Sequence, residues 1–365
     1  MRDRAGAVGA SRHRTVLGAI LGSALPAAVS WGLDVSTTSG IGTLVAPSWL
    51  RHSTRPLRRF LTLSPDQASF RTRKFISADP SKQLALEIAG KTFIGGYNEA
   101  LAADRPEDVL QHIHAVAPAL RGFAVEGAAM GCAIADILPF RRRSFAEHLQ
   151  TFEREFSYLT HVGAGWALAR VPWRRAAILA PLDPVHHWLA YDGLGFHDTF
   201  FHHRRILAGW RRQPSAYVAR AYDQGVGRAL WFVGGRSVAI ATDLIRTFAE
   251  ARQSDLWSGL GLAMAYAGPA DETDLSVARG NSGERAIHFG QGVAFACAAR
   301  ARARHIPAHT DLAAKFVTGI GADELSALVR AARNGLPADA ADAPAYEIWR
   351  RRVANALSPM LERRS

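Results

Sequence analysis

Two carboxylates stand within the most apolar helical stretch of the sequence. Glu126 and Asp136 lie in the segment Gly122–Leu138, which is rich in small and apolar residues. Ten residues are close to three helical turns, so both side chains are expected on one face of the helix. A buried carboxylate is costly unless it is paired or protonated. We therefore expect either a structural pair with an arginine such as Arg170 or Arg228, or an acid/base or cation-stabilising group that faces a cavity.

A stretch rich in histidine, aspartate, phenylalanine and glycine marks the middle of the chain. It is Asp192–His203, DGLGFHDTFFHH, and its two glycines and mixed composition predict a loop that lines a site. Three interpretations stay open: a metal or haem pocket, proton transfer by His197, or a solvated or packed cluster. The spacing matches no closed zinc pattern, so no metal ligand is assigned. The residues concerned are His186, His187, Asp192, His197, Asp198, His202 and His203.

Three other polar residues are candidates with competing structural roles. His161 has a counterpart at His288 in a matching segment, which favours a shared role such as a hydrogen bond to a loop. Asp223 and Arg228 lie about one helical turn apart, and they would either lock a helix start or act on a substrate. Tryptophans in apolar segments belong to a core in the simplest interpretation, and line a polyene or carbocation pocket in the alternative. They are Trp166, Trp231 and Trp257.

Standard catalytic signatures are absent from the sequence. It contains no Walker loop, no strand-linked GxGxxG, and no GxSxG, HExxH or CxxC motif. The aspartate-rich DDxxD and DxDD patterns of ordinary terpene cyclases are also missing. Phosphate and nicotinamide chemistries are therefore not first choices, and the cofactor stays unknown.

The composition is that of a globular protein with a basic balance. Of 365 residues, 48% are hydrophobic and 21% charged, and the net charge is +12. Nearly all basic residues are arginines, a bias that often reflects genomic base composition, and no basic run is interleaved with exposed aromatic residues. We therefore expect no nucleic-acid partner, and keep an anionic partner or a membrane surface as the alternative. Cys132 and Cys297 stand apart in apolar segments, as in a reducing compartment.

The first 56 residues form an extension with the layout of a signal peptide. Four arginines precede an apolar stretch, Val16–Val29, that Pro26 interrupts. The alternatives are export or a flexible or mis-started extension, and the cysteine-poor remainder does not support export. We expect a cytoplasmic protein, and keep peripheral association with a membrane as an alternative.

Cap residues and apolar periodicity predict a mainly α-helical chain. Asp79–Pro80 is a typical helix start, because Asp caps the first turn and Pro fits within it. Gly122–Leu138 is apolar nearly all round and predicts a central, buried helix. A short amphipathic element is expected at 57–63, and the predicted helices are 79–103, 108–116, 122–138, 148–159, 186–191, 322–334 and 346–363.

Matching segments indicate an internal duplication. Thr160–Arg170, THVGAGWALAR, is followed downstream by His288–Ala298, HFGQGVAFACA. Two further matches occur in the same order, FIGG with FVGG and EGAAM with LGLAM. The offset is 139 residues for the FIGG pair, 134 for the EGAAM pair and 127 for the His161 pair. The pattern predicts two related helical halves around a largely apolar cavity. The expected boundaries are 57–215 and 216–336, followed by a linker and basic helix at 337–365.

Several blocks of this sequence resemble a bacterial family of unknown function, DUF1702. They are EGAAM, HVGAGWALAR, LDP, YDGLGFH, YDQGVGRALWFV and DLWSGLGLA, and they span roughly Leu57 to Ala303. Members of that family are often encoded beside enediyne-type polyketide genes, so the resemblance implies a role in secondary metabolism on a long, apolar polyene or related chain. The N-terminal extension departs from the family pattern, as does Pro269, where the family usually has a glycine after Gly268.

The leading hypothesis is an enzyme without a nucleotide cofactor that cyclises or rearranges a hydrophobic polyene or isoprenoid, in a terpene cyclase-like reaction. Proton transfer or cation stabilisation would occur in the apolar cavity. One rival is a non-catalytic carrier or accessory subunit that works with other proteins of the same cluster, such as a membrane redox protein. Another is a haem- or metal-dependent oxidoreductase. The polar groups expected to face the cavity are Glu126, Asp136, His161, Asp192 and His197, with Asp223 and Arg228 as further candidates.

Overall fold

A computed structural model of the chain describes residues 60–76, 79–138, 144–212, 216–337, 339 and 343–363. These residues are mainly α-helical and contain no strand, which confirms the predicted fold class. All of them belong to one compact unit within residues 46–365. The predicted extension, 1–56, lies outside the described residues.

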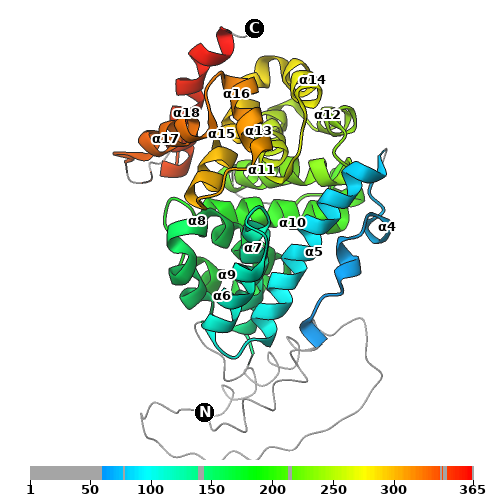
Figure 1. Cartoon of the computed structure of the whole chain (residues 1–365), viewed down its shortest axis with the longest axis vertical. Helices are drawn as coiled ribbons and strands as arrows, with labels where there is room; N and C mark the ends of the chain where they lie inside the picture. The colour runs from blue at the N-terminus through cyan, green and yellow to red at the C-terminus, as the bar shows by residue number, and fades with distance from the viewer. Residues whose placement is uncertain are drawn as a thin grey trace, which may run out of the picture. The chain divides into compact units, whose positions relative to one another are not determined.

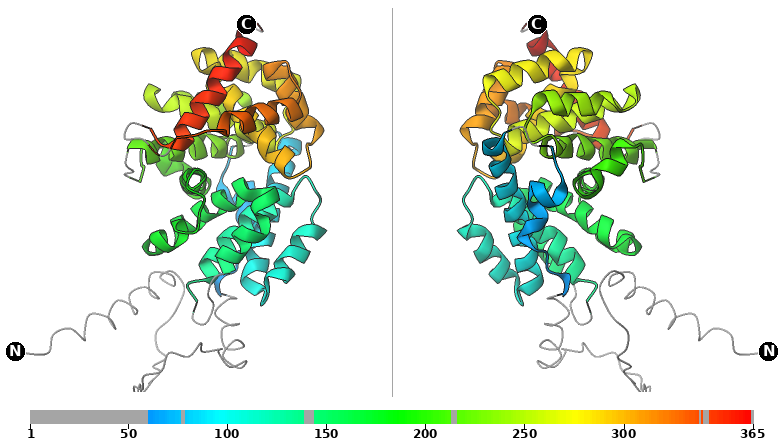
Figure 2. Two further views of the ribbon diagram at one scale, coloured as in Figure 1. Left: turned by 90° about the vertical axis from the view of Figure 1, so that its left-hand side faces the viewer. Right: turned by 90° about the vertical axis from the view of Figure 1, so that its right-hand side faces the viewer.

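Seven helices form a series in which each packs against the next (Figures 1 and 2). The series is α5 (Pro80–Ala102), α7 (Arg121–Ala135), α8 (Ser144–Arg170), α10 (Trp188–Leu207), α11 (Ala216–Val233), α13 (Glu250–Ala267) and α15 (Ala286–Arg302). Shorter helices surround it: α4 (Phe70–Arg73), α6 (Pro106–Ala115), α9 (Arg175–Leu179), α12 (Val238–Arg246), α14 (Glu272–Ser282), α16 (Ala308–Thr318), α17 (Ala322–Arg333) and α18 (Ala345–Glu362). The 3-10 turns are η1 (Pro65–Ala68), η2 (Pro172–Arg174) and η3 (Gly283–Arg285).

Neighbouring helices of the series touch backbone to backbone at glycines. A Cβ on Gly225 of α11 would lie 1.8 Å from the carbonyl oxygen of Asp192 in α10. In return, a Cβ on Gly195 of α10 would lie 2.0 Å from the carbonyl oxygen of Tyr222. Only glycine allows two helices to approach this closely, which explains its presence inside helices despite its low helix propensity. The other contacts of this kind join Gly96 to Ala124, Gly127 to Phe93, Gly131 to Tyr97, Gly163 to Glu126, Gly165 to Ala190, Gly193 to Val162, Gly227 to Leu256, Gly259 to Gln224, Gly261 to Phe289 and Gly292 to Ser258.

The Gly-x-Gly pattern that suggested a duplication recurs in five helices of the series, α8, α10, α11, α13 and α15. It begins at residues 163, 193, 225, 259 and 290, so successive copies are 30 to 34 residues apart. The matching segments at His161 and His288 therefore lie four helices apart in one series. The duplication into two halves stays a prediction. Repetition of one helix with a Gly-x-Gly pattern along the chain would account for the same sequence matches.

Several predicted elements are confirmed with small shifts. The side chain of Asp79 accepts a hydrogen bond from the Ser81 N–H, and Pro80 is the first residue of α5. Helix α7 is buried along most of its length, as its all-round apolar composition predicts. The last two helices lie within a residue or so of their predicted bounds.

The predicted loop at Asp192–His203 is wrong, because these residues are the interior of α10. Its glycines do not break the helix, since Gly193 lies against Val162 of α8 and Gly195 against Tyr222 of α11. The predicted short helix at 186–191 is the start of the same element. Helix α8 likewise continues from Ser144 to Arg170, with a kink at Phe156, where two separate segments were expected.

Buried ion pairs attach the C-terminal helix α18 to the series. Arg350 is 1% exposed and donates to Asp255 of α13 at 2.7 Å. Arg220 of α11 joins them through Glu347 at 2.6 Å and Asp255 at 3.0 Å. The predicted basic C-terminal helix is therefore part of the folded unit.

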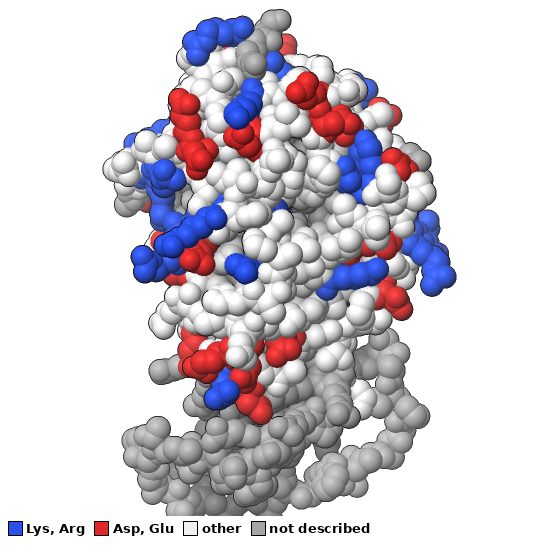
Figure 3. Space-filling model, in the orientation of Figure 1, with Lys and Arg blue, Asp and Glu red and all other residues white. Residues whose placement is uncertain are grey.

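Charges on the visible face are mixed (Figure 3). Basic and acidic side chains are interspersed over the described surface and separated by uncharged areas. None of the described helices combines the length and apolar character that crossing a membrane requires.

The backbone contacts predict a contrast between two glycine substitutions. Gly292→Ala would place a Cβ 1.9 Å from the Ser258 carbonyl oxygen, so it should lower the free energy of unfolding by about 1–3 kcal/mol. Gly280→Ala is the matched control, because this exposed helical glycine has nothing within 4 Å and should gain up to about 1 kcal/mol. Urea unfolding measures both, and equal effects would contradict the role assigned to the contacts.

Candidate functional site

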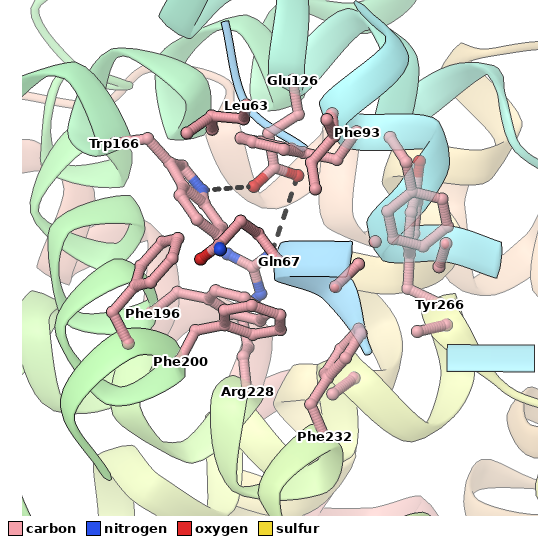
Figure 4. A pocket seen from close by; sticks show the side chains of 18 of the residues that line it. Leu63, Gln67, Phe93, Glu126, Trp166, Phe196, Phe200, Arg228, Phe232 and Tyr266 are labelled. Carbon is pink, nitrogen blue, oxygen red and sulfur yellow. Dashed lines mark hydrogen bonds and ion pairs between the residues drawn. The ribbon is translucent and has the colours of Figure 1, made fainter. Parts of the chain in front are cut away.

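An apolar pocket lies among helices α5, α7, α8, α10, α11 and α13 (Figure 4). Its unoccupied volume is about 650 Å³, including space open to solvent. Aromatic side chains make up much of its wall, and the η1 segment forms one side. The residues used below are Gln67, Phe93, Phe123, Glu126, Trp166, Phe196, Phe200, Phe201, Arg228, Phe232, Leu262 and Tyr266. They come from both predicted halves.

Glu126 is a buried carboxyl group on the wall of this pocket. The indole Nε1 of Trp166 donates to its Oε1 at 2.8 Å, and the guanidinium of Arg228 lies 3.9 Å from its Oε2 (Figure 4). Burial raises the pKa of Glu126 to about 7, although Arg228 and the Trp166 hydrogen bond favour the charged form. At neutral pH the protonated and the charged forms of Glu126 are therefore both populated.

Arg228 connects Glu126 to a second buried carboxylate. Its Nη1 donates to Asp192, and its guanidinium lies over the ring of Phe196 at 5.0 Å. Gln224 Nε2 also donates to Asp192 at 3.0 Å. Burial raises the pKa of Asp192, while Arg228 and Gln224 oppose that rise. The structure thus confirms Arg228 as the partner arginine and places it between two carboxylates.

A second pocket lies on the other side of this cluster. Its unoccupied volume is about 520 Å³, and it shares Arg228, Leu262 and Tyr266 with the first pocket. Glu126 lines the first pocket, Asp192 lines the second, and Arg228 lines both. Its remaining residues are Tyr158, Leu159, Val162, Leu189, Gln224, Phe295, Ala299, Tyr346 and Trp349.

Tyr266 and Gln224 are site residues that sequence reasoning missed. Tyr266 lines both pockets. Its hydroxyl packs against Gly122 of α7, because a Cβ added at Gly122 would lie only 1.9 Å from the hydroxyl oxygen. Gln224 lies four residues before Arg228, so helical spacing could have placed it on the same face of α11. No comparable signal marks Tyr266, because its position depends on how α13 packs against α7.

Asp136 does not share the position of Glu126. Helix α7 ends at Ala135, so the helical periodicity that relates the two residues stops before Asp136. Its carboxylate accepts from the backbone N–H of Ser144 at 2.9 Å and of Phe145 at 3.1 Å, at the start of α8. It is not among the residues that line the two pockets, and its role is to join α7 to α8.

The two candidate histidines are neutral and lie outside both pockets. His161 accepts from the Asp183 N–H at 3.0 Å, which agrees with the expected hydrogen bond to a loop. Burial lowers the pKa of His161 to about 4. His197 contacts Asp198 at 3.2 Å and packs edge-on against Trp166, and burial lowers its pKa to about 4 as well.

Asp223 and Arg228 do not pair with each other. Five residues separate them on α11, so they point in different directions. Asp223 accepts two hydrogen bonds from Arg252, at 2.6 and 2.9 Å, whereas Arg228 faces the pockets. The expectation that the two would jointly lock a helix start is wrong, since both lie inside α11.

The histidine-rich segment does not gather its side chains at one point. His186 packs against Tyr158 and Trp349, whereas His203 packs against Phe75. Within the described ranges, no group of three or more His, Cys, Asp or Glu residues is placed to hold a metal ion.

Comparison with known proteins identifies a family but no function. No curated protein and no solved structure matches the chain. The family described as "Protein of unknown function (DUF1702)" matches residues 53–357, a range that includes every residue of the two pockets. The chain belongs to the DUF1702 family.

Proposed function

We propose that the protein is an enzyme of secondary metabolism that isomerises or cyclises a hydrophobic polyene or isoprenoid by proton transfer in the first pocket. One observation carries this proposal: a buried carboxyl group, Glu126, with a pKa of about 7, stands on a wall made largely of aromatic rings. A general acid works best when its pKa lies near the operating pH.

The proposed reaction begins with transfer of a proton from Glu126 to one carbon of a double bond. The positive charge then develops on the neighbouring carbon, where the aromatic side chains that line the pocket, among them Phe93 and Phe200, stabilise it. Trp166 and Arg228 stabilise the carboxylate that is left behind. Loss of a proton from another carbon to Glu126 restores the acid and yields an isomer, so no electron acceptor is needed.

The apolar wall also protects a cationic intermediate. Water in the pocket would add to the cation and end the reaction, so exclusion of water by aromatic side chains favours rearrangement. The family resemblance supports the setting in secondary metabolism, with other proteins of the same cluster as partners. A cytoplasmic location with access to a membrane surface fits an apolar substrate.

A carrier of an apolar intermediate is the second candidate. Both oxygens of Glu126 already have neighbours, Oε1 with Trp166 and Oε2 with Arg228, as in a purely structural pair. A pocket of this kind could hold a polyene without changing it.

Substitution of Glu126 separates the two functions. Glu126→Gln keeps the shape and an acceptor for Trp166 but cannot supply the proton, so product formation should fall at least about 100-fold. Purified protein incubated with polyenes and isoprenoids, followed by chromatography and mass spectrometry, measures this. Glu250→Gln, an 86% exposed carboxylate, is the control. Unchanged product in Glu126→Gln would favour the carrier.

The raised pKa of Glu126 predicts a pH dependence of stability. Between its ordinary value of 4.5 and about 7, the folded protein holds a proton that the unfolded chain has released. Unfolding then releases a proton, so the free energy of unfolding falls as the pH rises through this window. Urea unfolding at several pH values should show wild type losing stability relative to Glu126→Gln from about pH 4.5 to 7. Parallel curves would contradict the raised pKa.

A further inference from the structure

Two arginines share one aromatic ring and have no carboxylate partner within the described part of the chain. Arg73 ends α4, and Arg170 ends α8. Their guanidinium carbons lie 4.8 and 5.1 Å from the ring centroid of Phe201, so they are no farther apart than these two distances together. Among the described residues, the buried Nε of Arg73 also has no hydrogen-bond partner. Most buried polar groups in proteins are paired, so this donor points to a bound group.

The positive charge of this pair is not balanced by its described surroundings. Burial and then the charge of Arg170 lower the pKa of Arg73, so the two cations act on each other. Asp198, whose charge acts with that of Arg170 on His197, is buried and already accepts from Arg212 at 2.7 and 3.1 Å. The end of a helix contributes a partial negative charge of only about half a unit. Two unit charges are therefore left for an anion.

Gln67 and Phe201 connect the two arginines to the first pocket. Arg73 donates its Nη2 to Oε1 of Gln67 at 2.6 Å, and both Gln67 and Phe201 line that pocket (Figure 4). Both are partly exposed, as is Arg73, and Arg170 is exposed. The volume of the pocket also includes space open to solvent. An apolar chain can therefore enter beside Gln67 and Phe201 and leave a charged end outside, at the arginines.

An aromatic row separates these arginines from the acid of the first pocket. The Phe201 ring lies edge-on to Trp166 with 6.1 Å between centroids, and the indole of Trp166 donates to Glu126 at 2.8 Å. Burial and then the charge of Arg228 act most strongly on the pKa of Glu126, and neither of the two arginines contributes. An anion held at the arginines thus stays apart from Glu126, while the chain attached to it extends towards the acid.

We propose that Arg73 and Arg170 bind the phosphate or diphosphate head group of a ligand whose apolar chain occupies the first pocket. A phosphate group carries nearly two negative charges at pH 7, which matches two cations better than a single carboxylate does. Guanidinium groups also bind phosphate oxygens in a bidentate manner. The inference rests on the proposed function, since the chain beside Glu126 is the part that reacts. Proton transfer to and from that chain leaves the head group attached, so the product keeps its phosphate.

Calorimetric titration with farnesyl diphosphate, farnesol and inorganic pyrophosphate tests this site. Wild-type protein should bind farnesyl diphosphate at least about tenfold more tightly than farnesol, which lacks the anion, or pyrophosphate, which lacks the chain. Arg73→Gln and Arg170→Gln should each weaken farnesyl diphosphate binding about three- to tenfold and leave farnesol binding unchanged. Raising the salt concentration should act in the same direction.

Arg246→Gln is the matched control, because this exposed arginine pairs with Asp243 and lines neither pocket. Its binding of all three probes should equal that of wild type. If the loss of the bond to Gln67 prevents Arg73→Gln from folding, Arg170→Gln still tests the site, since Arg170 is exposed. Thermal unfolding checks that each variant is folded before it is titrated.

Several outcomes would overturn the head-group site. They are equal binding of farnesol and farnesyl diphosphate, pyrophosphate binding as tight as that of farnesyl diphosphate, and arginine variants that bind like wild type. Loss of binding to phosphatidylglycerol vesicles with farnesyl diphosphate binding intact would assign the arginines to a membrane surface instead.

The proposed function fails separately from this inference. If Glu126→Gln still forms product while the arginine variants lose farnesyl diphosphate, proton transfer by Glu126 is wrong and the head-group site stands. If Glu126→Gln loses product while farnesol binds as tightly as the diphosphate, the acid stands and the head-group site is wrong.

Discussion

The closest approach of the helix backbones determines where the buried polar side chains meet. Each of these residues stands next to a glycine that contacts a neighbouring helix: Glu126 precedes Gly127, Asp192 precedes Gly193, and Arg228 follows Gly227. These glycines pack α7 against α5, α10 against α8 and α11 against α13, so they hold successive helices of the series close together. In that closely packed series, Arg228 of α11 reaches Asp192 of α10 and lies 3.9 Å from Glu126 of α7.

Arg228 then sets the electrostatics of that place. Its guanidinium cannot lose its proton, because Asp192 and Glu126 outweigh the effect of burial and raise the pKa of Arg228 above its ordinary value. The charge of Arg228 is balanced by a single carboxylate. The Arg228 guanidinium contacts Asp192 directly, whereas Glu126 lies 3.9 Å from it. Asp192 is thus the better placed counter-ion. Glu126 is left with less compensation for its burial, which is the physical reason that it can hold a proton near neutral pH.

Sequence patterns predicted the parts of this arrangement that depend on short stretches of chain. The start of α5 and the buried α7 follow from caps and apolar periodicity. The cost of burying a charge predicted an arginine near a carboxylate of α7, with Arg170 and Arg228 as the candidates, and the structure selects Arg228. The interior of α10 was misread, because glycine-rich composition signals a break unless a second helix lies against it. The positions of Gln224 and Tyr266 depend on contacts between elements distant in the sequence, which local patterns do not contain.

The glycines of the repeated pattern serve helix packing, whereas the side chains beside them differ from one copy to the next. In the predicted doubling, Glu126 in EGAAM corresponds to Leu260 in LGLAM, so only one of the two matched positions carries an acid. In the helix-by-helix description, the residue before the first glycine changes from Val162 in α8 to Asp192 in α10 and Gln224 in α11. Either way, the glycines recur while the adjacent side chain varies. The helices share one way of packing, and the acid at Glu126 belongs to a single, asymmetric site within it.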